Sequence, residues 1–231
     1  ARGLYGDHQP HRNFEDMARD YIAELKTVQP QGPYFLGGFS GGGITAFEMA
    51  RQLREAGDEI AILVLLDTPL AHSEPLSSVD RMSIHWQRIR SKGASYFTEW
   101  AKNRYQWEMQ KFSNRVKGEK EDKSPFDFQS ENIEIAFREA LEKYDTQPQP
   151  IKVTLFRPKL DKSYSLSGGR VANSTREFVY EDNGWTPYVD AIDIYEVPGD
   201  HDGMVLEPNV RVLASKMAQC IKAAESHNSN N

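Results

Sequence analysis

A serine, a histidine and two aspartates lie at positions in the chain where they could carry out nucleophilic catalysis. Ser40 lies within Gly38-Phe39-Ser40-Gly41-Gly42, which matches the pattern G-x-S-x-G. The apolar sequence "YFLGGF" leads into this pattern, and a segment with helical spacing follows it. This order is typical of a nucleophile elbow, a sharp strand-to-helix turn that exposes a serine hydroxyl. We therefore expect Ser40 to be a nucleophile, and side chains at Gly38 and Gly42 to clash with the nearby backbone.

A serine hydroxyl is a weak nucleophile unless a general base activates it. In the arrangement expected here, the acid and then the histidine follow the serine along the chain. His201 comes just after the strand-like sequence "IDIYEVPG", at a strand end where catalytic groups gather in open α/β sheets. The remaining histidines lie in loops, in a helical block or in the tail: His8, His11, His72, His85 and His227. We predict that His201 is the base.

The acid has two candidates. Asp67 ends the apolar run "IAILVLLD", and Asp161 lies five residues beyond the strand-like sequence "KVTLF". Spacing alone does not separate them, but Asp67 directly follows its strand and is held more firmly. Asp200 and Asp202 flank His201 and are poorly placed to reach its ring.

The pattern of apolar residues predicts an α/β fold with a parallel sheet. Runs without polar alternation, such as "IAILVLL", are typical of strands buried on both faces. We expect right-handed crossovers to place four parallel strands side by side in chain order. These strands are 34–39, 60–66, 152–156 and 192–197, and the main helices are 14–28, 41–56 and 208–224. A helical, aromatic block at about 70–148 is predicted to be an insertion without strands.

The composition argues against several classes of protein. The chain has 231 residues and a formal net charge of −6, which argues against general binding of nucleic acid. Its longest apolar run is too short to cross a membrane, and its single cysteine, Cys220, excludes an internal disulfide. No His or Cys pair has the spacing of metal ligands. We expect a cytoplasmic protein without a metal site.

Five segments, in this order, resemble the thioesterase domains that end modular nonribosomal peptide and polyketide synthases. They are "ARGLYG", "VQPQGPYFLGGFSGGGITAFEMARQL", "LVLLDTP", "NGW" at 183–185 and "EVPGDHDGMVLEPNVRVLA". As an ordered set they extend over nearly the whole chain and are far more specific than G-x-S-x-G alone. The resemblance implies an α/β-hydrolase fold and a single thioesterase domain over residues 1–231, with the block at about 70–148 as its helical lid.

The resemblance also implies roles for individual residues. Ser40 would be the nucleophile, His201 the base and Asp67, rather than Asp161, the acid. The backbone N–H of Gly41 would be one donor of the oxyanion hole. The substrate would be an acyl thioester on the phosphopantetheine of an acyl or peptidyl carrier protein, so no cofactor bound by the domain itself is expected. Release by hydrolysis and release by cyclisation both remain open.

The chain departs from the family pattern at its start. Domains of this family begin upstream of "ARG" with strands, a helix and the loop that supplies the second oxyanion donor. We therefore expect an N-terminally incomplete domain in which the second donor is absent and strand 34–39 lies at an open edge. A weaker catalyst is expected as a result.

Other functions remain possible on the same residues. Between Arg81 and Lys123 there are eleven Lys or Arg and five Asp or Glu, an excess that fits either an acidic carrier protein or a solvated helical face. A carboxylesterase, a lipase or a discrete editing thioesterase would use the same triad. A catalytically incompetent fragment that only binds acyl chains or carrier protein is the alternative outside enzymes.

Overall fold

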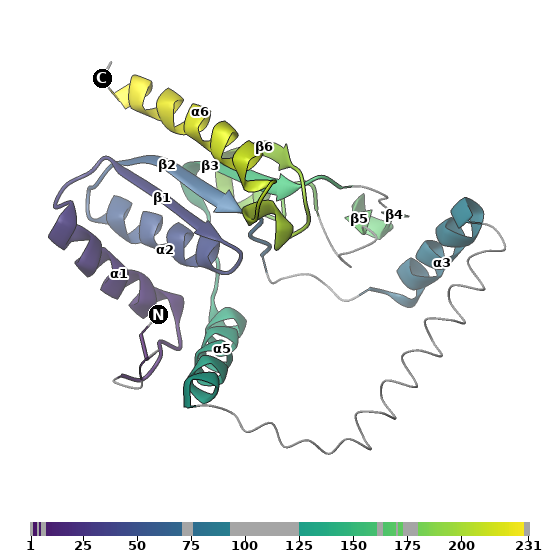
Figure 1. Ribbon diagram of the computed structural model, residues 1–231, viewed down its shortest axis with the longest axis horizontal. Coiled ribbons are helices and arrows are strands. Elements are labelled where there is room, and N and C mark those ends of the chain that lie inside the picture. Colours follow the sequence, from purple (N-terminus) through teal and green to yellow (C-terminus); the bar gives the residue numbers. More distant parts are fainter. Residues whose placement is uncertain are drawn as a thin grey trace.

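A parallel β-sheet forms the centre of the molecule, and helices cover both of its faces (Figure 1). The computed structural model describes residues 2–3, 5, 8–70, 76–92, 125–160, 164–169, 171–172 and 180–228. The main strands are β1 (Tyr34–Phe39), β2 (Ile60–Leu66), β3 (Gln149–Pro158) and β6 (Val189–Val197). They lie in the order β1-β2-β3-β6, and every neighbouring pair is parallel. The strand order and direction predicted from the sequence are therefore confirmed.

The sheet is apolar on both faces because each face packs against helices. Helices α1 (Phe14–Val28) and α2 (Gly42–Glu55) cover one face, and α6 (Val210–Asn228) covers the other (Figure 1). Leu63 and Leu65 of β2 join the core on the α1–α2 side, whereas Val64 between them joins the core beneath α6. This alternation explains why the sequence of β2 shows no polar positions.

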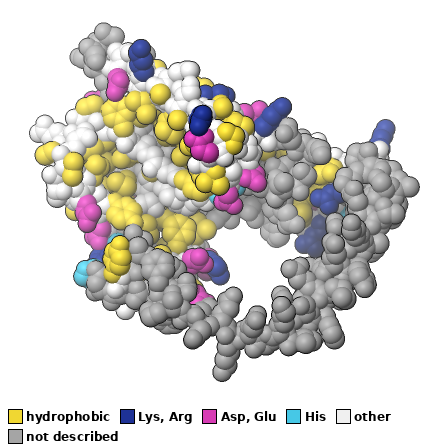
Figure 2. All heavy atoms as spheres, viewed as in Figure 1, with side chains coloured by type: hydrophobic (Ala, Val, Ile, Leu, Met, Phe, Trp, Pro, Cys, Tyr) yellow, Lys and Arg dark blue, Asp and Glu magenta, His cyan; other side chains and the backbone are white. Residues whose placement is uncertain are grey.

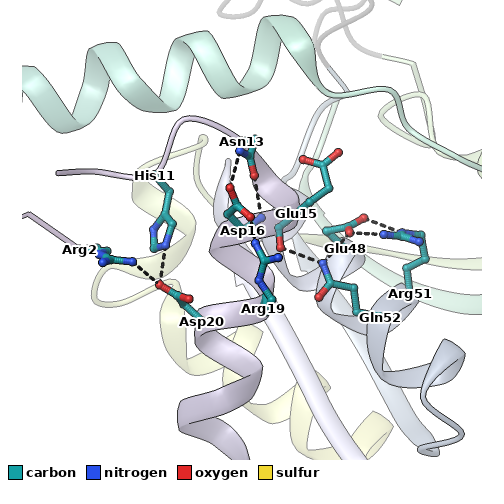
Figure 3. A network of polar contacts seen from close by, with 10 residues as sticks. All are labelled: Arg2, His11, Asn13, Glu15, Asp16, Arg19, Asp20, Glu48, Arg51 and Gln52. Atoms are coloured by element: carbon teal, nitrogen blue, oxygen red, sulfur yellow. Dashed lines mark hydrogen bonds and ion pairs between the residues drawn. The ribbon is translucent and has the colours of Figure 1, made fainter. Parts of the chain in front are cut away.

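Capping and side-chain contacts hold α1 against α2 (Figure 3). The Asn13 side chain accepts a hydrogen bond of 2.7 Å from the backbone N–H of Asp16 and so caps the start of α1. On α2, the Gln52 amide donates to the Glu15 carbonyl at 2.9 Å and to the Glu48 carboxylate at 2.8 Å. The first of these bonds joins the start of α1 to the last turns of α2, and the second lies within α2.

The second half of the block at 70–148 belongs to the main core. Helix α5 (Pro125–Lys143) contributes Ala136 and Ala140, which are fully buried. Phe14 of α1 packs edge-to-face against Phe137 and Tyr144, at ring-centroid distances of 5.2 and 5.1 Å. The described C-terminal part of this helix therefore packs directly against α1.

The first half of that block packs against a small hairpin that the sequence analysis missed. Helix α3 (Ser78–Lys92) contacts the antiparallel strands β4 (Tyr164–Ser165) and β5 (Val171–Ala172), beside the main sheet (Figure 1). The Asp80 carboxylate accepts hydrogen bonds from the N–H and hydroxyl of Ser167 at 2.9 and 2.7 Å. The first of these bonds is the main cause that lowers the pKa of Asp80. The hairpin was missed because each strand has only two residues.

Basic side chains are visible where α3 lies (Figure 2). Arg88 of α3 lies over the ring of Tyr164 at 5.3 Å from its centroid and so contacts the hairpin. Seven of the eleven Lys or Arg residues counted above, and all five Asp or Glu, fall in residues 93–124, outside the described part of the chain.

Several boundaries differ from the prediction. Strands β3 and β6 begin three residues earlier than expected, and α6 continues to Asn228. The two strands pair as far back as Gln149 and Val189, and an ion pair of 2.7 Å joins Lys152 to Asp193 between them. The added residues include Gln149, Pro150 and Asp190, which interrupt the apolar pattern expected of a strand. The described residues also form three short 3₁₀ segments, Ser167–Gly169, Thr186–Tyr188 and Gly203–Val205.

Strand β1 lies at an open edge of the sheet. Within the described ranges it pairs with β2 alone, as predicted. Phe35 near its start is 42% exposed. An apolar strand edge of this kind has backbone groups free to pair with another strand.

We predict that Tyr144→Phe destabilises the fold by about 1.5–3 kcal/mol, since the Tyr144 hydroxyl donates to the buried Glu48 carboxylate at 3.0 Å. Burial raises the pKa of Glu48, but its hydrogen bonds from Arg51, Gln52 and Tyr144 outweigh that effect and lower it. Urea unfolding measures the change. Tyr188→Phe is the control, because the Tyr188 ring packs against the same core and no described residue hydrogen-bonds its hydroxyl. An equal loss in the free energy of unfolding for Tyr144→Phe and Tyr188→Phe would contradict the prediction.

Candidate active site

Ser40 lies in a tight turn between β1 and α2. Its backbone has φ of +53°, a left-handed conformation that non-glycine residues rarely adopt. Its N–H donates to the Leu66 carbonyl at 2.8 Å, which ties the turn to the end of β2. A side chain at Gly38 would approach the carbonyl carbon and oxygen of Gly42 to 2.2 Å, so only glycine fits there. The turn therefore has the strained geometry that the sequence pattern predicts.

The prediction for Gly42 is wrong. A side chain at Gly42 would meet no atom within 4 Å, whereas one at Gly43 would come to 2.0 Å from the Thr68 hydroxyl oxygen. The glycine that close packing requires is therefore one residue further along. The reason is that Gly43 faces the chain just after β2, and Gly42 faces open space.

Asp67 follows β2 on the neighbouring strand. Its residue surface is fully buried and its φ is +45°, again left-handed. The Asp67 N–H donates to the Phe156 carbonyl of β3 at 2.7 Å. The backbone that leads into Asp67 is thus held by β3 on one side and by the Ser40 turn on the other.

His201 joins Ser40 and Asp67. Its Nδ1 lies 2.8 Å from an Asp67 carboxylate oxygen, and its Nε2 lies 3.0 Å from the Ser40 hydroxyl oxygen. The Asp67 carboxylate therefore lies at the His201 ring, and its role as the acid stays a prediction. Asp161 lies outside the described residues. The Asp200 carboxylate instead accepts from the Gly203 N–H at 2.7 Å.

Two phenylalanine rings border this group, and the sequence analysis identified neither. Phe39 stacks on the His201 ring at a centroid distance of 4.9 Å and an interplanar angle of 25°. Phe137 of α5 lies over the turn. Its ring is so close that a side chain at Gly41 would come to 2.3 Å from it. Phe39 occupies a free position in the motif and Phe137 is distant in sequence, so no local pattern indicates either contact. A cavity of about 390 Å³ adjoins the turn, lined in part by Phe137.

His11 is not part of the group formed by Ser40, Asp67 and His201, although it lines the cavity beside the turn. His11 Nε2 lies 2.8 Å from an Asp20 carboxylate oxygen, and this hydrogen bond is the main cause that lowers the pKa of Asp20 (Figure 3). His85 lies on α3, His72 falls outside the described residues, and the side chain of His227 is not described.

The described residues assemble no metal site and no membrane span. No group of three or more His, Cys, Asp or Glu side chains among them could hold a metal ion. None of the described helices is long and apolar enough to cross a membrane.

Comparisons with known proteins match the start of the chain to a family. Residues 1–83 match the family model of the thioesterase domain. The resemblance to thioesterase domains is confirmed. A non-reducing polyketide synthase of Cladonia grayi is 44% identical over 80 residues, and a dimodular nonribosomal peptide synthase of Bacillus subtilis (strain 168) is 43% identical over 76 residues. These matches cover 31% and 33% of this chain, but only 4% and 3% of the two synthases.

Solved structures extend the similarity to the rest of the fold. A holo four-domain nonribosomal peptide synthetase bound to AMP and glycine is 28% identical with a TM-score of 0.62, over 95% of this chain and 17% of that one. The thioesterase domain NocB, in covalent complex with a fluorophosphonate nocardicin G analogue, is 22% identical with a TM-score of 0.58, over 96% of this chain and 79% of that one. The predicted α/β-hydrolase fold is confirmed.

The two glycines at the start of α2 provide a test of the thioesterase-type turn. We expect Gly43→Ala to lower stability by about 1–3 kcal/mol, since its methyl group overlaps Thr68. Gly42→Ala is the matched control, with the same chemical change in open space, and should keep or raise stability by up to about 1 kcal/mol. Thermal unfolding of both variants decides. Equal stabilities would refute the packing that we describe.

Proposed function

We propose that this chain is a serine-dependent thioesterase that releases an acyl chain from the phosphopantetheine thioester of a carrier protein. One observation supports this most directly: the His201 imidazole lies within hydrogen-bond distance of both Ser40 and Asp67, at 3.0 and 2.8 Å. Both distances lie in the range that proton transfer and ring orientation need. The match to the thioesterase family supports the choice of a thioester substrate.

In the proposed first step, the Ser40 oxygen attacks the thioester carbonyl and its proton passes to Nε2 of His201. Asp67 holds the ring by Nδ1 and stabilises the imidazolium that forms. Negative charge develops on the carbonyl oxygen. The Gly41 N–H is proposed to bind it, because Gly41 is the N-cap of α2 and amide groups at a helix start favour negative charge. A second donor is not assigned.

In the proposed second step, the tetrahedral intermediate collapses, the C–S bond breaks and His201 returns its proton to the leaving thiol. The acyl group then forms an ester with Ser40. A water molecule, or a hydroxyl or amine of the acyl chain, attacks that ester while His201 again accepts the proton. The bond between the acyl carbon and the Ser40 oxygen then breaks, and His201 returns the proton to that oxygen. Water gives an acid, and an internal nucleophile gives a ring.

The proposed partner is an acyl or peptidyl carrier protein. Both curated relatives described above are synthases that make polyketides or nonribosomal peptides. The phosphopantetheine would belong to the carrier, so the domain itself needs no cofactor. We further propose that residues 1–231 form a single domain in which the block at about 70–148 acts as a lid, and that the protein works in the cytoplasm.

The substrate class can be tested with two small acyl compounds. An acyl-pantetheine thioester and a p-nitrophenyl ester of the same acyl group are compared by kcat/KM. We expect preference for the thioester. Preference for the simple ester would instead favour a carboxylesterase, and no turnover of either would favour a fragment that only binds.

We predict that Ser40→Ala abolishes labelling by a fluorophosphonate probe and lowers thioester turnover by about 10⁴-fold or more. NocB forms a covalent complex with a fluorophosphonate analogue, which makes this class of probe a suitable choice. The fold should survive, because the change removes a single oxygen. Ser215→Ala, on the exposed surface of α6, is the control and should label as the unaltered chain does. Unchanged turnover in Ser40→Ala would exclude the serine mechanism.

A further inference from the structure

The segment "NGW" at 183–185 contributed to the resemblance, but the proposed mechanism gives it no role. The structure places its first residue, Asn183, against the acid of the site. Asn183 is buried, and its side-chain amide donates to the Oδ1 atom of Asp67 at 3.0 Å. The Oδ2 atom of the same carboxylate lies 2.8 Å from His201. Asn183 and His201 therefore hold the two oxygens of one buried carboxylate.

The backbone of Asn183 is held as firmly as its side chain. Its carbonyl accepts from the Leu70 N–H at 3.1 Å, and its own N–H donates to Tyr180 at 3.1 Å. Its φ is +52°. Among the described residues, only three non-glycine residues have positive φ, and they are Ser40, Asp67 and Asn183. Strained backbone thus gathers at this one place, which is typical of functional sites.

The rest of the segment binds the residue after Asp67. The Trp185 ring is fully buried against Phe47 of α2, at a centroid distance of 4.8 Å. Its indole N–H donates to the Thr68 carbonyl at 2.7 Å. Through Asn183 and Trp185, the segment therefore contacts both the carboxylate of Asp67 and the backbone that follows it.

We propose that Asn183 is a positioning residue that sets the rotation of the Asp67 carboxylate. An aspartate carboxylate turns easily about its last bond, which has only broad preferred angles. A donor on one oxygen fixes the plane, so that the other oxygen faces Nδ1 of His201. The role rests on the proposed function, because it concerns the acid of that triad.

Asn183→Gly is the main test, because glycine adopts positive φ without strain and removes only the side-chain donor. The control is Asp182→Ala. Asp182 accepts hydrogen bonds from the N–H groups of Gly184 and Thr186, so its loss weakens the same turn without removing a donor to Asp67. Two measurements are made on each purified variant. One is the rate of labelling by a fluorophosphonate probe, and the other is the downfield proton NMR signal of the bond between His201 and Asp67.

We expect Asn183→Gly to lower the labelling rate by about 10- to 100-fold and to shift or broaden the downfield signal. Asp182→Ala should lower thermal stability but keep both readouts close to those of the unaltered chain. The proposal is overturned if Asn183→Gly labels at the rate of the unaltered chain and its NMR signal is unchanged. It is also overturned if the labelling rate falls by the same factor in Asn183→Gly and Asp182→Ala.

A second variant covers the case in which Asn183→Gly fails to fold. Asn183→Asp keeps the size and tolerates positive φ, but it places an acceptor where Asp67 needs a donor. We expect the labelling rate of Asn183→Asp to fall at least as far as that of Asn183→Gly. A labelling rate equal to that of the unaltered chain would overturn the proposal. The probe does not depend on the acyl substrate. A chain that labels but turns over no thioester would therefore contradict the proposed function and still test Asn183. If the unaltered chain does not label, the NMR signal decides.

Discussion

The hydrogen bond between Asp67 and His201 depends on a sheet whose strands all run in one direction. Parallel strands bring their carboxyl ends to one edge, and Ser40 and Asp67 therefore follow the neighbouring strands β1 and β2. His201 follows β6, two strands further on, so its loop has to reach back past the end of β3. This one bond joins residues 134 positions apart in the chain, and the orientation of the imidazole depends on it.

Much of this arrangement is visible in the sequence. The strands are apolar runs of suitable length, and right-handed crossovers leave few possible orders, so the sheet could be predicted. Ser40 and His201 could be predicted as well, because each directly follows such a run. The choice between Asp67 and Asp161 could not be made from spacing, since both follow strands. It needed the resemblance, and the structure now shows the Asp67 carboxylate at the imidazole.

Other features leave no local pattern. The contacts of Asn183 with Asp67, and of Phe137 with Gly41, join segments that are about a hundred residues apart. Periodicity reports which face of an element is apolar, but it does not report which side chain lies opposite. The same reason explains the error at Gly42. Three consecutive glycines look alike in a sequence, and only the packing of Thr68 distinguishes Gly43 from its neighbours.

Two side chains that pack directly against glycines limit which substitutions this turn can accept during evolution. Thr68 fills the space that a side chain at Gly43 would need, and Phe137 fills the space beside Gly41. A larger residue at either glycine is therefore tolerated only after its partner has become smaller. Relatives of this chain should change these positions in pairs, 43 with 68 and 41 with 137, while Gly42 varies independently. The residue types found at these positions in relatives would then follow the volume of the contacting side chain rather than the chemistry of the reaction.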